Sequence, residues 1–214
     1  MRLFLLFFCI AFLTGFQPQD TAWQLKKFEQ GISVYTRNTE SSKYKELKAV
    51  YQVKTSLSSI IALLNDVPTY PEWVFRCGSS KVLQHISDQD LIRYQTVVAP
   101  WPVDNRDMVV EAKTSQDEKT GIVYQRVSGR PDFIKEAPNH VRIREFRGLW
   151  TLTPKPGGMV EVQYELLVNP AGNIPAWIVN MAVVDGPFET SVNMKEWLKK
   201  EKYQKASFPF IKEP

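Results

Sequence analysis

The feature that most constrains the fold is a run of consecutive strand-type segments from Lys81 to Val168, followed by one long helical segment. Alternating stretches such as "LIRYQTVV", "VRIREFRGLWTLTP" (141–154) and "MVEVQYELLV" recur in this run, each predicted as one strand, and short turn sequences such as "DQD" and "KPGG" lie between strands. Strands joined by such short connections pair antiparallel, because parallel neighbours need long crossover connections. The sequence therefore predicts a large antiparallel sheet.

The segments before this run add helices and two more strands. Residues 20–30, "DTAWQLKKFEQ", are predicted to form a short helix with Trp23, Leu25 and Phe28 as its apolar anchors. Two alternating strands follow, "GISVYTRN" and "YKELKAVYQVK". A second helix is predicted after Ser56, which can cap it, and this helix ends at Pro68. Its apolar residues repeat at helical spacing: Leu57, Ile60, Ile61 and Leu64. The next stretch, "PTYPEWVFRCGSS", is predicted to be a loop rich in aromatic residues.

Residues 173–204 are predicted to form the long C-terminal helix. Pro187 is expected to kink or break it, because proline cannot donate the backbone hydrogen bond that the helix requires at this position. The order of elements favours an α+β fold, in which a curved antiparallel sheet wraps around a long C-terminal α-helix. Such a sheet encloses a space that the helix must fill or cover.

The N-terminus has the pattern of a secretory signal peptide over residues 1–17. One early arginine precedes a short apolar run, "LFLLFFCIAFLTGF", and polar residues follow at once. The run is short for a membrane-spanning helix, which needs about 20 apolar residues. We expect a secreted or periplasmic protein, or a membrane-anchored one if the leader is not cleaved.

Charge and residue counts narrow the class of function. The chain has 27 basic and 23 acidic residues, interleaved rather than clustered, so its net charge of +4 does not indicate nucleic-acid binding. It is compatible with a transient contact with an anionic membrane surface. Cys77 would be the one cysteine after leader cleavage, and a buried structural thiol is predicted. His85 and His140 are expected to be solvated, and no catalytic set, metal-ligand spacing or phosphate-binding loop is found.

Two motifs carry a resemblance to a known family. "APWPVDNRDMVV" (99–110) resembles the Pro-Trp-Pro bend and Arg-Asp strand start of the START domain family, a lipid-transfer module with the helix-grip fold. "NPAGNIPAWIVN" (169–180) is similar to that family's entry into the C-terminal helix, and "GLWTLTP" and "GISVYTR" agree with it. The resemblance covers about residues 22–204, and we place the domain at 20–206 with a C-terminal tail at 207–214.

The resemblance implies an internal apolar cavity that binds one lipid or another hydrophobic small molecule. It does not imply catalysis, and we expect no cofactor, no metal and a monomer. Strand alternation and the family pattern together suggest these cavity-lining residues: Arg93, Gln95, Trp101, Met108, Val110, Tyr164, Leu166, Trp177, Ile178 and Met181. Arg106 and Asp107 are assigned a structural role at the bend, and Arg142, Arg144 and Arg147 are predicted to be surface charges.

Three alternatives stay open at this point. The apolar faces could form a solid core, since sequence cannot reveal an empty space. Arg93 could point outward into solvent, or inward to meet a phosphate or carboxylate. Finally, the same fold could support a cyclase or dehydratase acting on an aromatic or polyketide-like substrate, which would require Tyr164, Arg93 and Glu111 to converge in the cavity.

Overall fold

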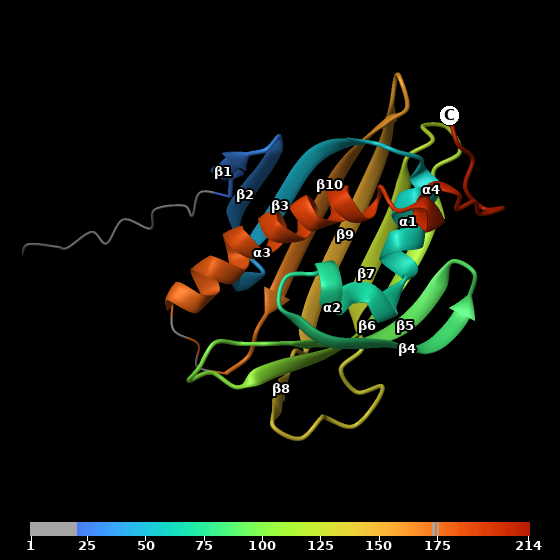
Figure 1. Cartoon of the computed structure of the whole chain (residues 1–214). Helices are drawn as coiled ribbons and strands as arrows, with labels where there is room; N and C mark the ends of the chain where they lie inside the picture. Colours follow the sequence, from blue (N-terminus) through green and yellow to red (C-terminus); the bar gives the residue numbers. More distant parts are fainter. Residues whose placement is uncertain (1–20, 173, 175) are drawn as a thin grey trace, which may run out of the picture.

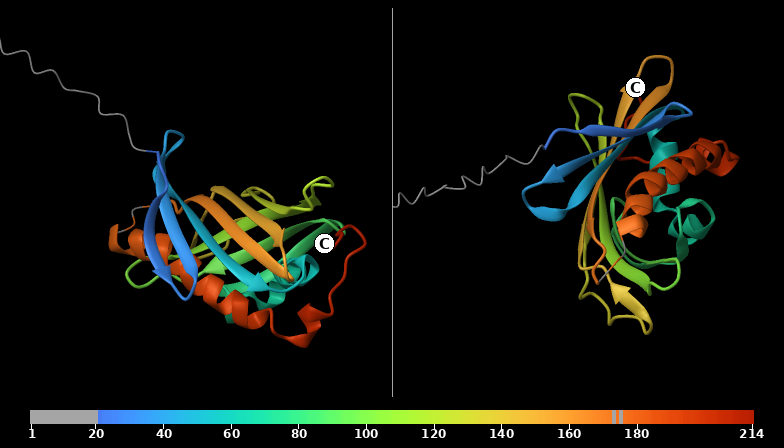
Figure 2. Two further views of the ribbon diagram at one scale, coloured as in Figure 1. Left: turned by 90° about the horizontal axis from the view of Figure 1, so that it is seen from above. Right: turned by 90° about the vertical axis from the view of Figure 1, so that its left-hand side faces the viewer.

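The computed structural model describes residues 21–172, 174 and 176–214, and its sheet has the helices packed on one face (Figures 1 and 2). The strands are β1 (Gln24–Glu29), β2 (Ile32–Thr39), β3 (Ser42–Lys54), β4 (Cys77–Ser87), β5 (Asp90–Val97), β6 (Asn105–Gln116), β7 (Val123–Gly129), β8 (His140–Arg142), β9 (Glu145–Lys155) and β10 (Met159–Asn169). The helices are α1 (Leu57–Asn65), the 3-10 turn η1 (Val67–Thr69), α2 (Tyr70–Trp73), α3 (Ala176–Trp197) and α4 (Glu201–Gln204).

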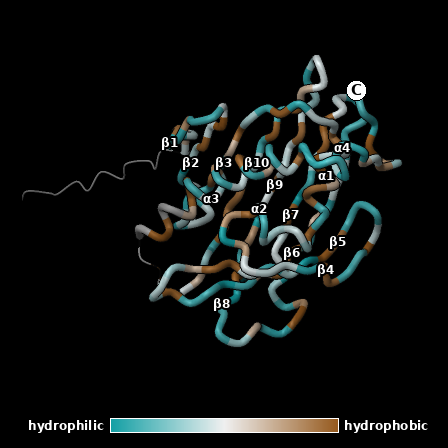
Figure 3. Tube along the Cα trace, in the orientation of Figure 1, coloured by the Kyte–Doolittle hydropathy of each residue, from teal (hydrophilic) through white to brown (hydrophobic). Residues whose placement is uncertain are grey.

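The sheet confirms the predicted antiparallel α+β architecture. Its strand order is β1-β2-β3-β10-β9-β7-β6-β5-β4, and every pair of neighbours on this path is antiparallel. The long helix α3 crosses the sheet and contacts β2 and β3 (Figure 1). Buried residues alternate with more exposed ones along β2 and β7, and hydrophilic and hydrophobic stretches are interspersed along the sheet (Figure 3).

Helix α1 forms as the sequence predicts. The Ser56 hydroxyl accepts a hydrogen bond from the backbone N–H of Ser59 (3.0 Å) and so caps the first turn. Four apolar residues of this helix are almost completely buried: Leu57, Ile60, Ile61 and Leu64. Helical spacing placed these side chains on the core face, and the structure confirms it.

The helix predicted at residues 20–30 is wrong, because Gln24–Glu29 form strand β1. Gln30 and Gly31 both have positive φ angles (51° and 73°), which is the geometry of a two-residue hairpin turn, and β1 pairs with β2 through this turn. Leu25 and Phe28, predicted as apolar anchors, are 54% and 69% exposed. The third anchor, Trp23, lies under the cationic groups of Arg37 and Lys48.

Two other segments also differ from the prediction. The aromatic loop after Pro68 contains η1 and α2, and β4 begins earlier than predicted, at Cys77. The single strand predicted from Val141 to Pro154 is split into β8 and β9, and β8 pairs parallel with β6. The Ile143 N–H still donates to the Asp107 carbonyl of β6 (2.9 Å), and β9 then pairs with β7 and β10.

Helix α3 is shorter than predicted but continues through Pro187. It ends at Trp197, and the separate helix α4 follows. Within this continuous helix the Ser191 hydroxyl donates to the Pro187 carbonyl (2.7 Å). Gly186, beside it, allows a close approach: a Cβ there would lie 3.4 Å from the ring of Phe75.

The C-terminal segment 207–214 packs against the domain. Ile211 is 7% exposed and belongs to the hydrophobic core. The Glu213 carboxylate accepts hydrogen bonds from the backbone N–H groups of Leu57 and Ser58 (2.9 and 2.8 Å) at the start of α1. A carboxylate at a helix N-terminus is favourable, because the unpaired N–H groups carry a partial positive charge.

Candidate ligand-binding cavity

A cavity of about 460 Å³ lies between the sheet and α3. This volume falls within the range of small-molecule sites, roughly 300–1,000 Å³. Its wall is mainly apolar and aromatic and draws on β3, β5, β6, β9, β10, α2 and α3. The principal apolar and aromatic contributors are Leu47, Leu64, Tyr70, Trp73, Phe75, Val97, Met108, Phe146, Trp150, Tyr164, Leu166, Val168, Ile178 and Val183.

Most of the residues predicted for the cavity wall lie on it. These are Arg93, Gln95, Met108, Tyr164, Leu166 and Ile178. Val110 instead lies in the packed core, 0% exposed, and does not line the cavity. Trp177 and Met181 belong to α3, but their side chains lie outside the described residues. The role of these residues in binding stays a prediction.

Trp101 does not line the cavity, so its predicted position is wrong. Its side chain is 90% exposed. The Val103 N–H donates to the Pro100 carbonyl (3.0 Å), which closes a tight turn with Trp101 and Pro102 at its tip. The residues beside the tip, including Pro100 and Val103, line the cavity in its place.

The inner wall carries a buried arginine, Arg93, beside the ring of Tyr70. Arg93 points inward: its side chain lines the cavity and the residue is 6% exposed. Its guanidinium lies 5.1 Å from the ring centroid of Tyr70. Tyr164 stacks on Trp150, with ring centroids 4.0 Å apart. Burial raises the pKa of both Tyr70 and Tyr164 above the ordinary range, and the charge of Arg93 only partly offsets this, so both remain neutral phenols.

The charged residues of the wall are all basic. Within the described part of the chain, Lys43, Lys45, Arg76, Arg93 and Arg106 line the cavity, and no Asp or Glu does. Lys43, Lys45 and Arg76 are exposed and so mark where the cavity reaches the surface. Because the whole chain is nearly balanced in charge, this one-sided lining is a local feature of the cavity.

Glu111 does not join this wall. Its carboxylate instead forms an ion pair with Arg130 (2.9 Å). The convergence of Tyr164, Arg93 and Glu111 that the enzymatic alternative requires is therefore not formed.

Sequence reasoning missed several parts of the cavity wall. The α2 aromatics Tyr70 and Trp73 were assigned to a loop, although "TYPEWVF" shows their clustering. Trp150 was missed as well, yet it is the direct cross-strand neighbour of Tyr164 in the β9–β10 pairing. Such a pair could have been found by aligning the two strands around the "KPGG" turn.

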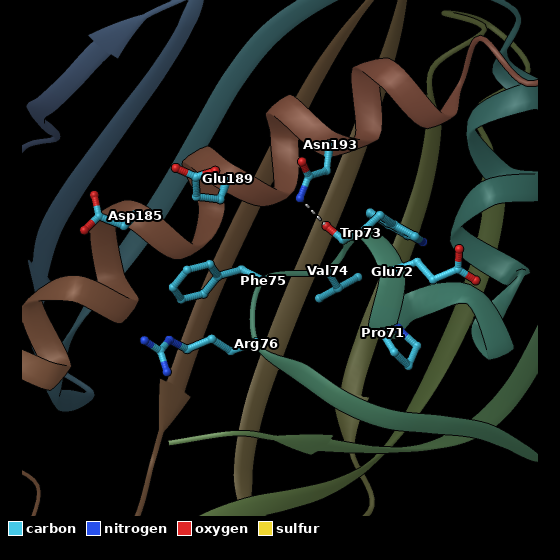
Figure 4. Close-up of a pocket in the computed structure, with 9 residues that line it drawn as sticks. All are labelled: Pro71, Glu72, Trp73, Val74, Phe75, Arg76, Asp185, Glu189 and Asn193. Carbon is cyan, nitrogen blue, oxygen red and sulfur yellow. Dashed lines mark hydrogen bonds between the residues drawn. The ribbon is translucent and has the colours of Figure 1, made fainter. Parts of the chain in front are cut away.

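A second, outer hollow adjoins the cavity along the junction of α2 and α3 (Figure 4). Residues 73–76 line both spaces and form the partition between them. Two hydrogen bonds hold this partition to α3. Asn193 donates to the Trp73 carbonyl (3.0 Å), and the Phe75 N–H donates to the Thr190 hydroxyl (3.1 Å).

The start of β6 has the structural role predicted for it. Arg106 donates to the carbonyls of Pro170 (3.2 Å) and Ala171 (3.1 Å), which ties the bend to the segment before α3. Asp107 is completely buried and pairs with Arg142 through two hydrogen bonds (2.8 and 2.9 Å). Arg142 was predicted to be a surface charge and is instead 3% exposed, because Asp107 and three loop carbonyls surround its guanidinium. Arg144 is exposed, as predicted.

The remaining reactive groups are not among the residues that line the cavity. Cys77 is buried as predicted, and burial raises the pKa of its thiol to about 11, so it is protonated at neutral pH. His85 is exposed, and His140 is half-buried, with its ring against the Pro138 carbonyl. Among residues 21–172, 174 and 176–214 there is no cluster of three or more side chains suited to a metal ion. None of the helices in these ranges has the length and hydrophobicity of a membrane span.

Comparison with known proteins gives a consistent result. The START domain model matches residues 11–204. An uncharacterized protein of Pseudomonas aeruginosa is 36% identical over 170 residues, 78% of this chain and 82% of that protein. The phosphatidylcholine transfer protein of Mus musculus is 28% identical over 174 residues, 77% of this chain and 78% of that protein. The crystal structure of the STAR-related lipid transfer protein from Xanthomonas axonopodis has a TM-score of 0.77 and 32% identity, covering 83% of this chain and 99% of that one. The match over residues 11–204, with a relative 36% identical over most of both chains, shows that this chain belongs to the START domain family.

Proposed function

We propose that this chain binds one lipid or similar hydrophobic molecule in its cavity and transfers it between membranes without altering it chemically. The observation that carries the proposal is the cavity itself, which is large enough for a ligand and mainly apolar. The phosphatidylcholine transfer protein and the STAR-related lipid transfer protein, both similar to this chain, support transport as the activity. The protonated state of Cys77, Tyr70 and Tyr164 supports binding rather than nucleophilic catalysis.

A vesicle assay tests this proposal. Donor vesicles carrying a fluorescent fatty acid or phospholipid are mixed with acceptor vesicles that carry a quencher. Catalytic amounts of the protein are expected to accelerate quenching in proportion to protein concentration. No acceleration with any lipid class, together with no lipid recovered from the purified protein by extraction, would contradict the proposal.

Trp101 is proposed to insert transiently into the membrane during transfer. An exposed aromatic side chain at the tip of the bend, beside the cavity-lining residues Pro100 and Val103, is suited to the membrane interface. Trp101→Ala is expected to slow transfer by roughly tenfold, because burying a large apolar side chain contributes about 1.5–3 kcal/mol. The affinity for lipid presented in detergent should not change.

The matched control is Phe28→Ala, which removes another exposed aromatic (69% exposed) from the edge strand β1. This variant should transfer lipid at the wild-type rate. An equal loss in both variants, or none in Trp101→Ala, would show that Trp101 has no specific role at the membrane.

We further propose that the protein acts outside the cytoplasm, exported by its N-terminal leader. The basic start and short apolar run of residues 1–17 support this, although they lie outside the described residues. Fractionation of the source cells, with N-terminal sequencing of the mature protein, tests the localisation. A full-length protein in the cytoplasmic fraction would contradict it.

A further inference from the structure

The guanidinium of Arg93 is a buried charge without the hydrogen-bond partners it needs. Arg93 is 6% exposed, and its Nε and Nη1 atoms have no hydrogen-bond acceptor in the protein. Buried arginines are normally paired, because removing a charge from water costs several kcal/mol unless hydrogen bonds replace the lost solvation. The described residues therefore leave the Nε and Nη1 donors of this guanidinium without an acceptor.

Acidic residues on the neighbouring strands do not fill this role. Glu111 pairs with Arg130, Asp107 with Arg142, and Asp90 lies 3.3 Å from Lys113. The aromatic face of Tyr70 lies beside the guanidinium but offers no acceptor to its N–H groups. Since no Asp or Glu in the described part of the chain lines the cavity, the missing acceptor must come from whatever occupies the cavity.

We propose that the ligand carries an anionic group, a carboxylate or a phosphate, which Arg93 binds at the inner wall while the acyl chain fills the apolar part of the cavity. The inference rests on the proposed lipid-binding function and specifies its ligand class. A planar guanidinium matches both anions through paired N–H donors, and a charge-assisted hydrogen bond is stronger in a dry site. The exposed Lys43, Lys45 and Arg76 at the opening add positive charge along the entry path.

The test uses pairs of lipids that differ only in the head group. The mature protein is incubated with an equimolar mixture of palmitic acid and hexadecanol, or of dioleoyl phosphatidic acid and dioleoylglycerol. It is then separated from free lipid, and the bound lipids are quantified by mass spectrometry. The wild type is expected to enrich the anionic member of at least one pair by roughly tenfold or more, as one strong charge-assisted contact implies.

Arg93→Met removes the charge and keeps much of the side-chain length. Its enrichment ratio is expected to fall to about one, while neutral lipid remains bound. Its melting temperature should be equal to or above that of the wild type, because an unpaired buried charge has been removed. Arg93→Lys keeps the charge but not the paired donors, so it should retain a reduced preference for the anion. It also tests the proposal if the Met variant does not fold.

Arg126→Met is the matched control, since Arg126 is exposed on β7 and does not line the cavity. This variant should keep the wild-type enrichment ratio. A loss of enrichment equal to that in Arg93→Met would mean that overall charge causes the effect, which would overturn the proposal. Undiminished enrichment in Arg93→Met would also overturn it. A further arm adds inorganic phosphate, and displacement of bound lipid by phosphate at equimolar concentration would show that the site binds a free anion rather than a head group.

The two proposals fail in different ways. Equal binding of acid and alcohol by the wild type would overturn the role of Arg93 and leave lipid binding intact. Binding of neither member of any pair would count against lipid binding itself.

Discussion

Asp107→Asn is expected to lower the free energy of unfolding by about 3–5 kcal/mol, the usual cost of removing one partner from a buried ion pair. Both side chains are almost completely buried, and two hydrogen bonds join them. The variant leaves the Arg142 guanidinium buried without its counterion. It also replaces one carboxylate oxygen by an NH2 donor, so either Arg142 Nε, or Arg142 Nη2 together with the Ala137 N–H, loses its acceptor, and the loop between β7 and β8 should loosen. Urea unfolding followed by fluorescence measures the change.

The exposed pair of Arg144 and Asp132 provides the control. The Arg144 Nη1 and Asp132 Oδ1 atoms lie 3.0 Å apart, close to the distance in the buried pair, but the Asp132 side chain is 83% exposed. Asp132→Asn should change the free energy of unfolding by no more than about 1 kcal/mol, as is typical of surface ion pairs. Similar effects in the two variants would mean that the buried pair does not fix the start of β6.

The pH dependence of stability follows from the same carboxyl group. Burial alone would raise the pKa of Asp107, but hydrogen bonds from Arg142 and Ala137 and the arginine charge outweigh it, so this pKa lies below the ordinary value. Ionised Asp107 therefore contributes stability that is fully present above the unfolded-state pKa of about 3.9 and is lost as the pH falls through the lower folded-state pKa. Asp107→Asn should lack this contribution, so the gap between variant and wild type should narrow below about pH 4.

Filling the cavity should abolish ligand binding. Leu166 lies on β10 and Val183 on α3, and both line the cavity from opposite walls. The double variant Leu166→Trp/Val183→Trp would place two indoles in this space and should reduce bound lipid by at least about tenfold. Because the space is empty of protein atoms, the free energy of unfolding should stay within about 1 kcal/mol of the wild-type value. A solid core would instead lose about 1–3 kcal/mol through overpacking.

The control adds the same two indoles at the surface. Leu25 and Ile86 are 54% and 48% exposed, on β1 and β4. The variant Leu25→Trp/Ile86→Trp should bind lipid like the wild type. Undiminished binding in the filled variant, or a large loss of stability with it, would argue against an open cavity at this place.

The parts of the fold that depend on local pattern could be predicted from the sequence. Alternation identified most of the strands, and the spacing of Leu57, Ile60 and Leu64 identified α1. Residues 24–29 could not be assigned this way, because their pairing depends on the turn at Gln30 and Gly31. The secondary structure of such a short segment depends on the strand with which it pairs, whatever the spacing of its apolar residues.

The side-chain chemistry of the cavity was harder to predict. On β5, Leu91, Ile92 and Arg93 are all buried. The alternation of apolar and polar residues therefore does not predict to which face of the sheet the Arg93 side chain points. The counterion of Arg142 lies 35 residues away in sequence, which local pattern cannot reveal. An empty space leaves no mark on composition, since a lining residue and a core residue are equally apolar.

Native mass spectrometry of the mature protein, purified from its source without added detergent, tests the central claim most directly. The protein should carry one non-covalent adduct per chain, released on denaturation and identified as a lipid. The bare mass should appear in the Leu166→Trp/Val183→Trp variant. A wild-type protein that shows only the bare mass, both as purified and after incubation with lipid vesicles, would contradict the account.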